Sequence, residues 1–318
     1  MACKPRKIQR VVIVGAGAVG ASYASRFFDM DSSCVSLAAA GERYDRLKAE
    51  GLVVNGVHYA FPVLSPEDDS PPADLILVTV KHYHLVNALP ILKNWVGKDT
   101  VLLSLMNGLD SESIIGSFYG QEKILYATVV GINASREGNV IKNSKVGTIF
   151  FGEADNSVLS ERVMTLQALF DRSGIDHQSP ADMIRTLWWK FMINVGINQA
   201  SAVLSAPYSV FQTSKHARQI MELAMREVIS VAGAAGVDLL EQDIQDWYRF
   251  LEKLDPQGKT SMLQDIEAGR TTEVDIFAGK VMELGKTFRI TTPINEFLYH
   301  AIKVVETGIE NNQEKPGK

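Results

Sequence analysis

The stretch VVIVGAGAVG, residues 11–20, decides the fold of this chain. Its first four residues are apolar, which is typical of a strand buried on both faces of a parallel sheet. The pattern G-x-G-x-x-G follows directly. In such a loop Gly15 permits a tight turn, Gly17 lets the backbone approach a pyrophosphate, and Gly20 allows a helix to pack closely on the strand. The motif therefore predicts a strand, a glycine loop and a helix that together bind a dinucleotide.

The helix start after the loop supplies the second part of the predicted phosphate site. Backbone N–H groups at a helix start are unpaired, and the helix dipole favours negative charge there. A glycine-rich turn without a ligand is the alternative interpretation. We expect the cofactor phosphates to be bound by six consecutive residues, Gly15, Ala16, Gly17, Ala18, Val19 and Gly20.

Outward from this loop, strand-like apolar runs alternate with helical patterns. A helix is expected near residues 157–172, before a last strand that ends at about residue 179. Alternation of strand and helix is typical of a doubly wound α/β sheet. We therefore expect a Rossmann-type parallel sheet domain over residues 1–180. The runs that predict further strands are residues 35–38, 73–81, 100–108, 123–130 and 146–152.

The character of the sequence changes at Ala181. Strand-like runs stop, and segments with a 3.6-residue period replace them. MELAMREVISVAGAAG, residues 221–236, is amphipathic and ends in a glycine stop at Gly236. VDIFAGKVMELGKTF, residues 274–288, repeats the pattern. We expect residues 181–318 to form an all-helical domain that supplies substrate-binding and catalytic side chains.

Composition restricts the classes of function. The 318 residues, 46% of them hydrophobic and 22% charged, suffice for two globular domains. The net charge of −5 gives no case for nucleic acid or an anionic membrane as a partner. Cys3 and Cys34 cannot build a disulfide framework, and the histidines lack metal-ligand spacing, so we expect a cytoplasmic protein without a metal site. The basic MACKPRKIQR mimics a signal peptide, but the apolar run after it is better explained as a buried strand.

A polar stripe interrupts one strongly apolar segment, LWWKFMINVGINQASAVL, residues 187–204. Lys190, Asn194 and Asn198 follow one another at intervals of four, and each such step turns a helix face by only about 40°. Burial of an unpaired amide or charge costs several kcal/mol, so the stripe needs partners. A structural carboxylate or a neighbouring loop is one source. A small anionic substrate with a carbonyl group is the other, and it is the interpretation we favour.

The choice of cofactor depends on the end of the second strand. An acidic residue there binds the ribose 2′-hydroxyl of NAD, whereas a basic residue accepts the 2′-phosphate of NADP. The segment AAAGER, residues 38–43, has no Asp at this point. Arg43 and Arg46 favour NADP, and Glu42 leaves NAD open. The alternative for the two arginines is an exposed helix face.

Several motifs in order resemble the ketopantoate reductase family over nearly the whole chain. Besides GAGAVG, they are VTVK ending at Lys81, MNG containing Asn107, WWKFMINVGINQASAV around Lys190, and TSMLQDIEAGRTTEVD around Glu273. The resemblance implies a Rossmann domain, a helical domain and an active site between them. It also implies reduction of 2-dehydropantoate to (R)-pantoate with NADPH, on the route to pantothenate and coenzyme A.

The resemblance also implies a role for each residue of the stripe and its surroundings. Lys190 would be the general acid that protonates the keto oxygen, and Asn194 and Asn198 would line the substrate site. Ser261 would bind the substrate carboxylate, and Glu273 its terminal hydroxyl. The chemistry agrees, because hydride addition builds negative charge on oxygen and burial lowers the pKa of a lysine. Ser261 also opens S-M-L-Q, which fits a helix N-cap, and Glu273 fits an ordinary first helical turn.

Two further residues would lie by the cofactor. Asn107 would orient the reactants near the nicotinamide, and Lys81 would follow a sheet strand beside the dinucleotide. An ordinary turn pair with Gly108 is the alternative for Asn107, and a strand cap is the alternative for Lys81.

One departure from the family leaves other functions open. Many members have an Arg where this chain has Ala40, and that Arg would contact the 2′-phosphate. This departure leaves NAD open as the cofactor, with Arg43 as the substitute contact to the 2′-phosphate of NADP. A reductase of another branched 2-oxo acid is the second hypothesis, and a non-catalytic dinucleotide sensor is the third. The apolar helices are compatible with a homodimer or with core packing alone.

Overall fold

The computed structural model describes residues 7–313 of the chain. The chain divides into two compact units between Leu187 and Trp188, inside helix α6 (Met183–Leu204). Our predicted boundary at residues 180/181 lies just before this helix and stays a prediction. Cys3 lies outside the described residues, and Cys34 is a buried free thiol.

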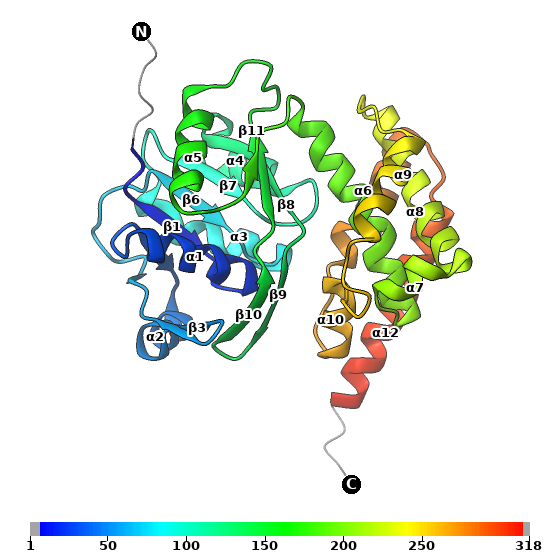
Figure 1. The fold of residues 1–318 in the computed structure, drawn as a ribbon, viewed down its shortest axis with the longest axis horizontal. Helices are drawn as coiled ribbons and strands as arrows, with labels where there is room; N and C mark the ends of the chain where they lie inside the picture. Colours follow the sequence, from blue (N-terminus) through cyan, green and yellow to red (C-terminus); the bar gives the residue numbers. More distant parts are fainter. Residues whose placement is uncertain (1–6, 314–318) are drawn as a thin grey trace. The chain divides into compact units, whose positions relative to one another are not determined.

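The first unit contains the predicted sheet, with eight strands in the described residues (Figure 1). Its order is β12-β11-β8-β7-β6-β1-β2-β5. Neighbours are parallel except β8 and β11, which run antiparallel. The prediction of a Rossmann-type parallel sheet is confirmed, with the antiparallel pair β8 and β11 as the exception. The strands are β1 (Val11–Val14), β2 (Val35–Ala38), β5 (Val63–Leu64), β6 (Leu75–Val78), β7 (Val101–Ser104), β8 (Ile124–Val130), β11 (Thr148–Gly152) and β12 (His177–Gln178).

Both faces of the sheet are buried, which explains the continuous apolar runs. Val11 and Ile13 belong to one core, together with residues of helices α1 (Ala18–Met30) and α5 (Glu161–Arg172). The other face of β1 belongs to a second core that includes residues of three helices on the far side of the sheet. These are α3 (Leu85–Ala88), the 3₁₀ helix η2 (Leu89–Trp95) and α4 (Ser111–Tyr119), and the short 3₁₀ helices η1 (His82–His84) and η3 (Gln121–Lys123) complete the connections.

A second, smaller sheet lies outside the sequence prediction. Within the described residues it has four strands, in the order β4-β3-β10-β9. Two of its strands follow helix α2 (Gly41–Glu50), the other two follow β8, and the sheet packs against α1. Only short or polar segments form it, so they show no buried apolar run. The strands are β3 (Leu52–Val54), β4 (Val57–Tyr59), β9 (Asn133–Glu137) and β10 (Val140–Lys145).

The second unit is all-helical over residues 188–313, as predicted (Figure 1). Helix α8 stops at Ala234, and Gly236 follows with a φ of +81°, which matches the predicted glycine stop. The helical pattern predicted over residues 274–288 is divided at Phe277 into a short 3₁₀ helix and an α-helix. The helices are α6, α7 (Tyr208–Thr213), α8 (Lys215–Ala234), α9 (Glu241–Leu251), α10 (Ser261–Glu267), the 3₁₀ helix η4 (Val274–Ile276), α11 (Ala278–Phe288) and α12 (Pro293–Gln313).

Helix α6 is the apolar centre of the second unit. Phe191, Met192 and Val195 are almost completely buried. Within residues 7–313, no helix combines the length and the apolar character needed to cross a bilayer.

Candidate active site

The glycine loop has the conformation that its three glycines predict. Gly15 has a φ of +99°, and a Cβ built there would lie 2.6 Å from the backbone carbon of Thr79. A Cβ on Gly20 would collide with the carbonyl oxygen of Gly15, so only glycine permits this close helix–strand packing. A Cβ on Gly17 would meet no atom within 4 Å. The backbone at Gly17 is therefore open to a ligand, and the loop fits a pyrophosphate.

The first turn of α1 completes this phosphate site. The helical ladder begins where the Ala21 N–H donates to the Gly17 carbonyl at 3.0 Å. The amides of Ala18, Val19 and Gly20 precede that bond, at the positive end of the helix dipole. Such a helix start is a general site for anions.

The loops after β6 and β7 lie beside the glycine loop. Strand β1 pairs with β2 on one side and β6 on the other, so the sheet changes direction here. In open α/β sheets ligands bind at the carboxyl ends of strands at such a switch point. Pairing continues past the strand ends, because the Thr79 N–H donates to Val14 and the Leu105 N–H to Val78, both at 2.9 Å. Lys81 lies two residues after Thr79, and Asn107 lies two residues after Leu105.

Three arginines gather next to this loop. Arg43 and Arg46 lie in α2, directly after β2, and Arg136 lies in β9. The Arg136 guanidinium donates from Nη1 to the carbonyl oxygen of Ala16 in the glycine loop, and from Nε to that of Gly138 at 2.8 Å. In the described part of the chain, none of the three arginines is paired with a carboxylate.

The charges of these arginines affect one another. Partial loss of hydration lowers the pKa of Arg136, and the charges of Arg43 and Arg46 lower it further. The pKa of Arg43 falls for the same two reasons, loss of hydration and then the charge of Arg46. Like charges without a counterion create a strong positive potential. Arg136 escaped the sequence analysis, because the polar segment NASRE gives no signal of a strand that returns to the glycine loop.

The polar stripe of the second unit lies on one continuous helix. Lys190, Asn194 and Asn198 all belong to α6, and the two asparagines are only 4% and 6% exposed. Lys190 is half-buried, and burial lowers its pKa to about 8. Its ammonium group has no hydrogen bond or ion pair with any residue of the part that the structure describes. A lysine of this kind can donate a proton near neutral pH.

Buried polar contacts hold α6 at one rotation. Gln199 donates to the Asn295 side chain at 3.2 Å and accepts from the Ala278 N–H at 3.0 Å. The Thr260 hydroxyl donates to the Ser201 hydroxyl at 3.1 Å. Gln199, Ser201 and Thr260 are at most 1% exposed, so these bonds are shielded from water. The bond to Ala278 also explains the helix break at Phe277, since it takes an amide that a longer helix would use.

Ser261 does not cap its helix. Thr260 is the N-cap of α10, and its hydroxyl accepts from the Leu263 N–H at 3.2 Å. Ser261 is the first helical residue, and its side chain is exposed. The N-cap interpretation of Ser261 is therefore wrong by one residue, because the preceding threonine offers the same cap chemistry. The Ser261 hydroxyl lies at a helix start, where a carboxylate is favoured.

Glu273 lies just before η4 and is 8% exposed. Its loop is anchored by Thr272, whose N–H and hydroxyl both donate to Glu306, at 2.8 and 2.7 Å. The Glu273 carbonyl accepts from the Ile276 N–H at 3.1 Å, which fixes the turn after it. A buried carboxylate on an anchored loop is suited to a specific polar contact.

A cavity of about 480 Å³ lies at the opposite edge of the sheet. Its lining includes Ile8, Asp74 and Thr100, which precede β1, β6 and β7. It is therefore at the amino ends of the strands, away from the glycine loop. Within residues 7–313 no group of three or more His, Cys, Asp and Glu side chains is arranged to hold a metal ion.

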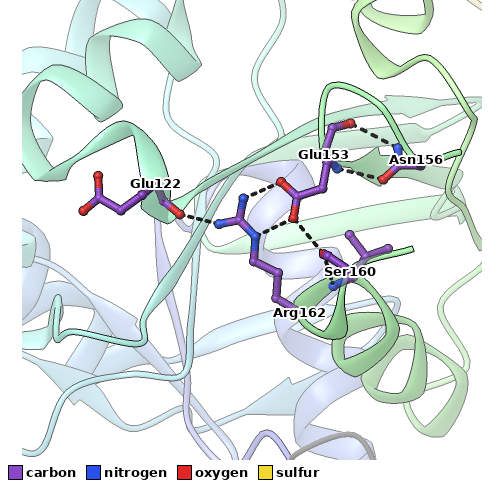
Figure 2. Close-up of polar contacts among 6 residues, drawn as sticks. Glu122, Glu153, Asn156, Ser160 and Arg162 are labelled. Carbon is purple, nitrogen blue, oxygen red and sulfur yellow. Dashed lines mark hydrogen bonds and ion pairs between the residues drawn. The ribbon is translucent and has the colours of Figure 1, made fainter. Parts of the chain in front are cut away.

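Among the cations that line this cavity, Arg162 is already neutralised (Figure 2). Arg162 forms a two-pronged ion pair with Glu153 and donates to the Glu122 carbonyl. Ser160, the N-cap of α5, donates to the same Glu153 carboxylate at 2.7 Å. The bond from Arg162 lowers the pKa of Glu153. These contacts join α5 to the end of β11, and they indicate a structural role.

Comparison with known proteins gives the same result for both parts of the chain. The protein-family model "Ketopantoate reductase PanE/ApbA" matches residues 11–156, and the model of the C-terminal part of the same family matches residues 182–306. The 2-dehydropantoate 2-reductase of Archaeoglobus fulgidus is 28% identical, over 95% of this chain and all of that protein. The one from Aquifex aeolicus is 24% identical, over 94% of this chain and 97% of that protein.

Solved structures show the same fold. The 2-dehydropantoate 2-reductase of Methylococcus capsulatus superposes with a TM-score of 0.80 at 25% identity, covering 94% of this chain and 97% of that one. A D-mandelate dehydrogenase in complex with NADH gives a TM-score of 0.84 at 24% identity, covering 94% and 99% of the two chains.

Proposed function

The chain belongs to the ketopantoate reductase family, and on that premise we propose that it reduces 2-dehydropantoate to (R)-pantoate with NADPH, using Lys190 as the general acid. As a member of this family it is an oxidoreductase that acts on CH–OH donors. The observation that carries the proposal is Lys190 itself: a half-buried lysine with a pKa of about 8 and no partner among the described residues.

The first unit supports the cofactor assignment. The open backbone at Gly17 and the amides that follow suit the phosphates of a dinucleotide. We assign Gly15, Ala16, Gly17, Ala18, Val19 and Gly20 to this role, with Lys81 and Asn107 beside the cofactor. When bound, a reduced nicotinamide supplies the hydride.

Lys190 supplies the proton. Hydride addition to a ketone develops negative charge on the oxygen, and a nearby ammonium stabilises that charge. Transfer of a proton from Nζ then completes the alcohol, and a donor pKa of about 8 suits transfer near neutral pH.

The other side chains of the second unit hold the substrate in this proposal. Asn194 and Asn198 extend the same face of α6 and would bind the 2-oxo acid. Ser261, at the start of α10, would contact the carboxylate, and Glu273 the terminal hydroxyl. These four roles rest on the family resemblance and on position in the helices, and those of Asn194, Asn198 and Glu273 also rest on burial.

Arg43 supports NADP as the preferred cofactor, although NAD stays open because Ala40 replaces the family arginine. We further propose a cytoplasmic location. A homodimer stays a prediction.

Turnover tests the proposal directly. Oxidation of NADPH in the presence of 2-dehydropantoate should be followed at 340 nm for the purified protein, with NADH in a parallel assay. Turnover with the named substrate supports the assignment. Binding of NADPH without turnover on any 2-oxo acid would revive the dinucleotide sensor.

A second candidate is a reductase of another branched 2-oxo acid. Ala40, which departs from the family pattern, is the observation that favours it. A panel of 2-oxo acids with and without a terminal hydroxyl separates the two candidates. A poor rate with 2-dehydropantoate beside a good rate elsewhere in the panel would overturn the first.

A further inference from the structure

No sequence motif predicts the position of Arg136 in the first unit. It lies on β9, more than a hundred residues after the glycine loop, yet its guanidinium bonds to the Ala16 carbonyl inside that loop. The bond to Gly138 on the same hairpin fixes the other side of the guanidinium. Two contacts with neutral carbonyls therefore hold a cation against the predicted dinucleotide site.

The position of Arg136 leaves most of its hydrogen-bonding capacity open. A guanidinium has five N–H donors, and the two bonds to Ala16 and Gly138 use two of them. No carboxylate in the described part of the chain neutralises its charge. A partly buried arginine of this kind is suited to a ligand that brings negative charge and several acceptor oxygens.

The neighbouring charges identify the anion. Arg136 lies within electrostatic range of Arg43 and Arg46. Those two residues occupy the first turns of α2, directly after β2, where dinucleotide folds bind the adenosine ribose. A phosphate on the 2′-hydroxyl of that ribose carries the charge and the oxygens that three arginines can share.

We propose that Arg136, together with Arg43 and Arg46, binds the 2′-phosphate of NADP and thereby sets the cofactor preference of the enzyme. This proposal rests on the proposed function, because it assumes a nicotinamide dinucleotide at the glycine loop. Arg136 thus takes the role of the arginine that many family members have at the position of Ala40. Arg136 belongs to the small second sheet, so a residue that determines cofactor specificity lies outside the strand–loop–helix motif.

Binding of dinucleotide fragments tests this proposal without turnover. Dissociation constants are measured by calorimetry for 2′,5′-ADP, 5′-ADP, NADPH and NADH, with the full-length protein and Arg136→Ala. Hydrogen bonds to charged groups contribute enough for roughly a 10- to 100-fold effect. We expect Arg136→Ala to weaken 2′,5′-ADP and NADPH by that factor and to change 5′-ADP and NADH less than about twofold.

Two further variants give the controls. Lys142→Ala removes a positive charge from β10 on the same hairpin, but Arg136 pairs with Ile141, so Lys142 lies on the opposite face. It should leave all four dissociation constants unchanged. Arg136→Lys keeps the charge, and we expect it to recover part of the affinity for 2′,5′-ADP.

Equal weakening of all four ligands by Arg136→Ala would overturn the proposal, because it would indicate that the residue only supports the glycine loop. An unchanged preference for 2′,5′-ADP would overturn it as well. Both results leave the proposed function standing if the unaltered protein binds NADPH and turns over. An unaltered protein that binds none of the four ligands would overturn the inference and the proposed function together.

Discussion

Lys190 owes its proposed chemistry to its surroundings. The side chain lies on an apolar helix, is half-buried, and has no partner among residues 7–313. Burial disfavours the charged ammonium, which brings the pKa down from 10.5 to about 8. An exposed lysine holds its proton too firmly to serve as a donor at neutral pH.

Replacement of Lys190 should remove the chemical step. We expect Lys190→Ala to lower kcat for 2-dehydropantoate reduction by roughly 100- to 10,000-fold, the usual contribution of a general acid. The affinity for NADPH, measured by fluorescence titration, should change little. Lys253→Ala, which alters an exposed lysine of the same unit, is the control. Normal turnover in Lys190→Ala would refute the assignment.

The same side chain predicts the pH dependence of reduction. The donor must be protonated, so the rate should be constant below the Lys190 pKa and fall tenfold per pH unit above about 8. Arg does not release its proton, so Lys190→Arg should be poorly active and should not show this fall. A measured kcat profile that stays flat to pH 10 in the unaltered enzyme contradicts the prediction.

At the scale of elements, the glycines of the loop have two different roles: some are required by the fold, and one leaves space for a ligand. Gly15 and Gly20 are required by close contacts with the protein itself, whereas Gly17 faces open space. Only Gly17 therefore leaves room that the folded chain does not use. A ligand is the natural occupant of such a position in a phosphate loop.

Two alanine variants should divide these roles. Gly17→Ala adds a methyl group where no protein atom lies within 4 Å, so the free energy of unfolding should change by less than about 1 kcal/mol. Its NADPH affinity should fall at least about tenfold, because the methyl group blocks the pyrophosphate. Gly15→Ala, by contrast, should lower the free energy of unfolding by on the order of 1–3 kcal/mol, since the φ of Gly15 is +99°. Thermal melts and NADPH titrations measure both effects. Unchanged NADPH affinity in Gly17→Ala would exclude the loop as the phosphate site.

At the scale of the whole molecule, one buried carboxyl links stability to pH. Glu112 in α4 is 4% exposed and accepts from the Ser111 hydroxyl at 2.8 Å. Ser111 in turn accepts from Ser104 at the end of β7. Burial raises the pKa of Glu112 to about 7, although the Ser111 bond acts in the opposite direction. The folded protein therefore keeps a proton that the unfolded chain releases above pH 4.5.

Stability should consequently fall as the pH rises from 4.5 to 7, by on the order of 3 kcal/mol from this group. Glu112→Gln keeps the shape and removes the titration, so its denaturant midpoint should vary less over this range. Glu296→Gln, at an exposed position, is the control and should follow the unaltered protein. Parallel curves for Glu112→Gln and the unaltered protein would show that Glu112 is not responsible.

How far the sequence predicts this molecule depends on how local each signal is. The sheet strands β1 and β2 match their predicted bounds because their residues are almost all apolar, with Ser36 the one polar residue among them. Strands β9 and β10 form a hairpin of mostly polar residues, and they were missed because such segments show no apolar run. The pairing of β10 with the distant β3 gives no local signal either. The capping serine was misplaced by one residue, since Thr260 and Ser261 have equivalent hydroxyls and only the backbone decides between them.

The sequence by itself determined the α/β sheet, the helical second unit, the glycine loop and the spacing of Lys190, Asn194 and Asn198 on one helix. These features follow from periodicity and from backbone angles open to glycine, both of which act over a few residues. Only the tertiary structure decided which charges are buried, which hydroxyl caps α10, and that Arg136 reaches the glycine loop. Those outcomes depend on contacts made in the folded chain, and a local sequence pattern does not predict the free energy of such contacts.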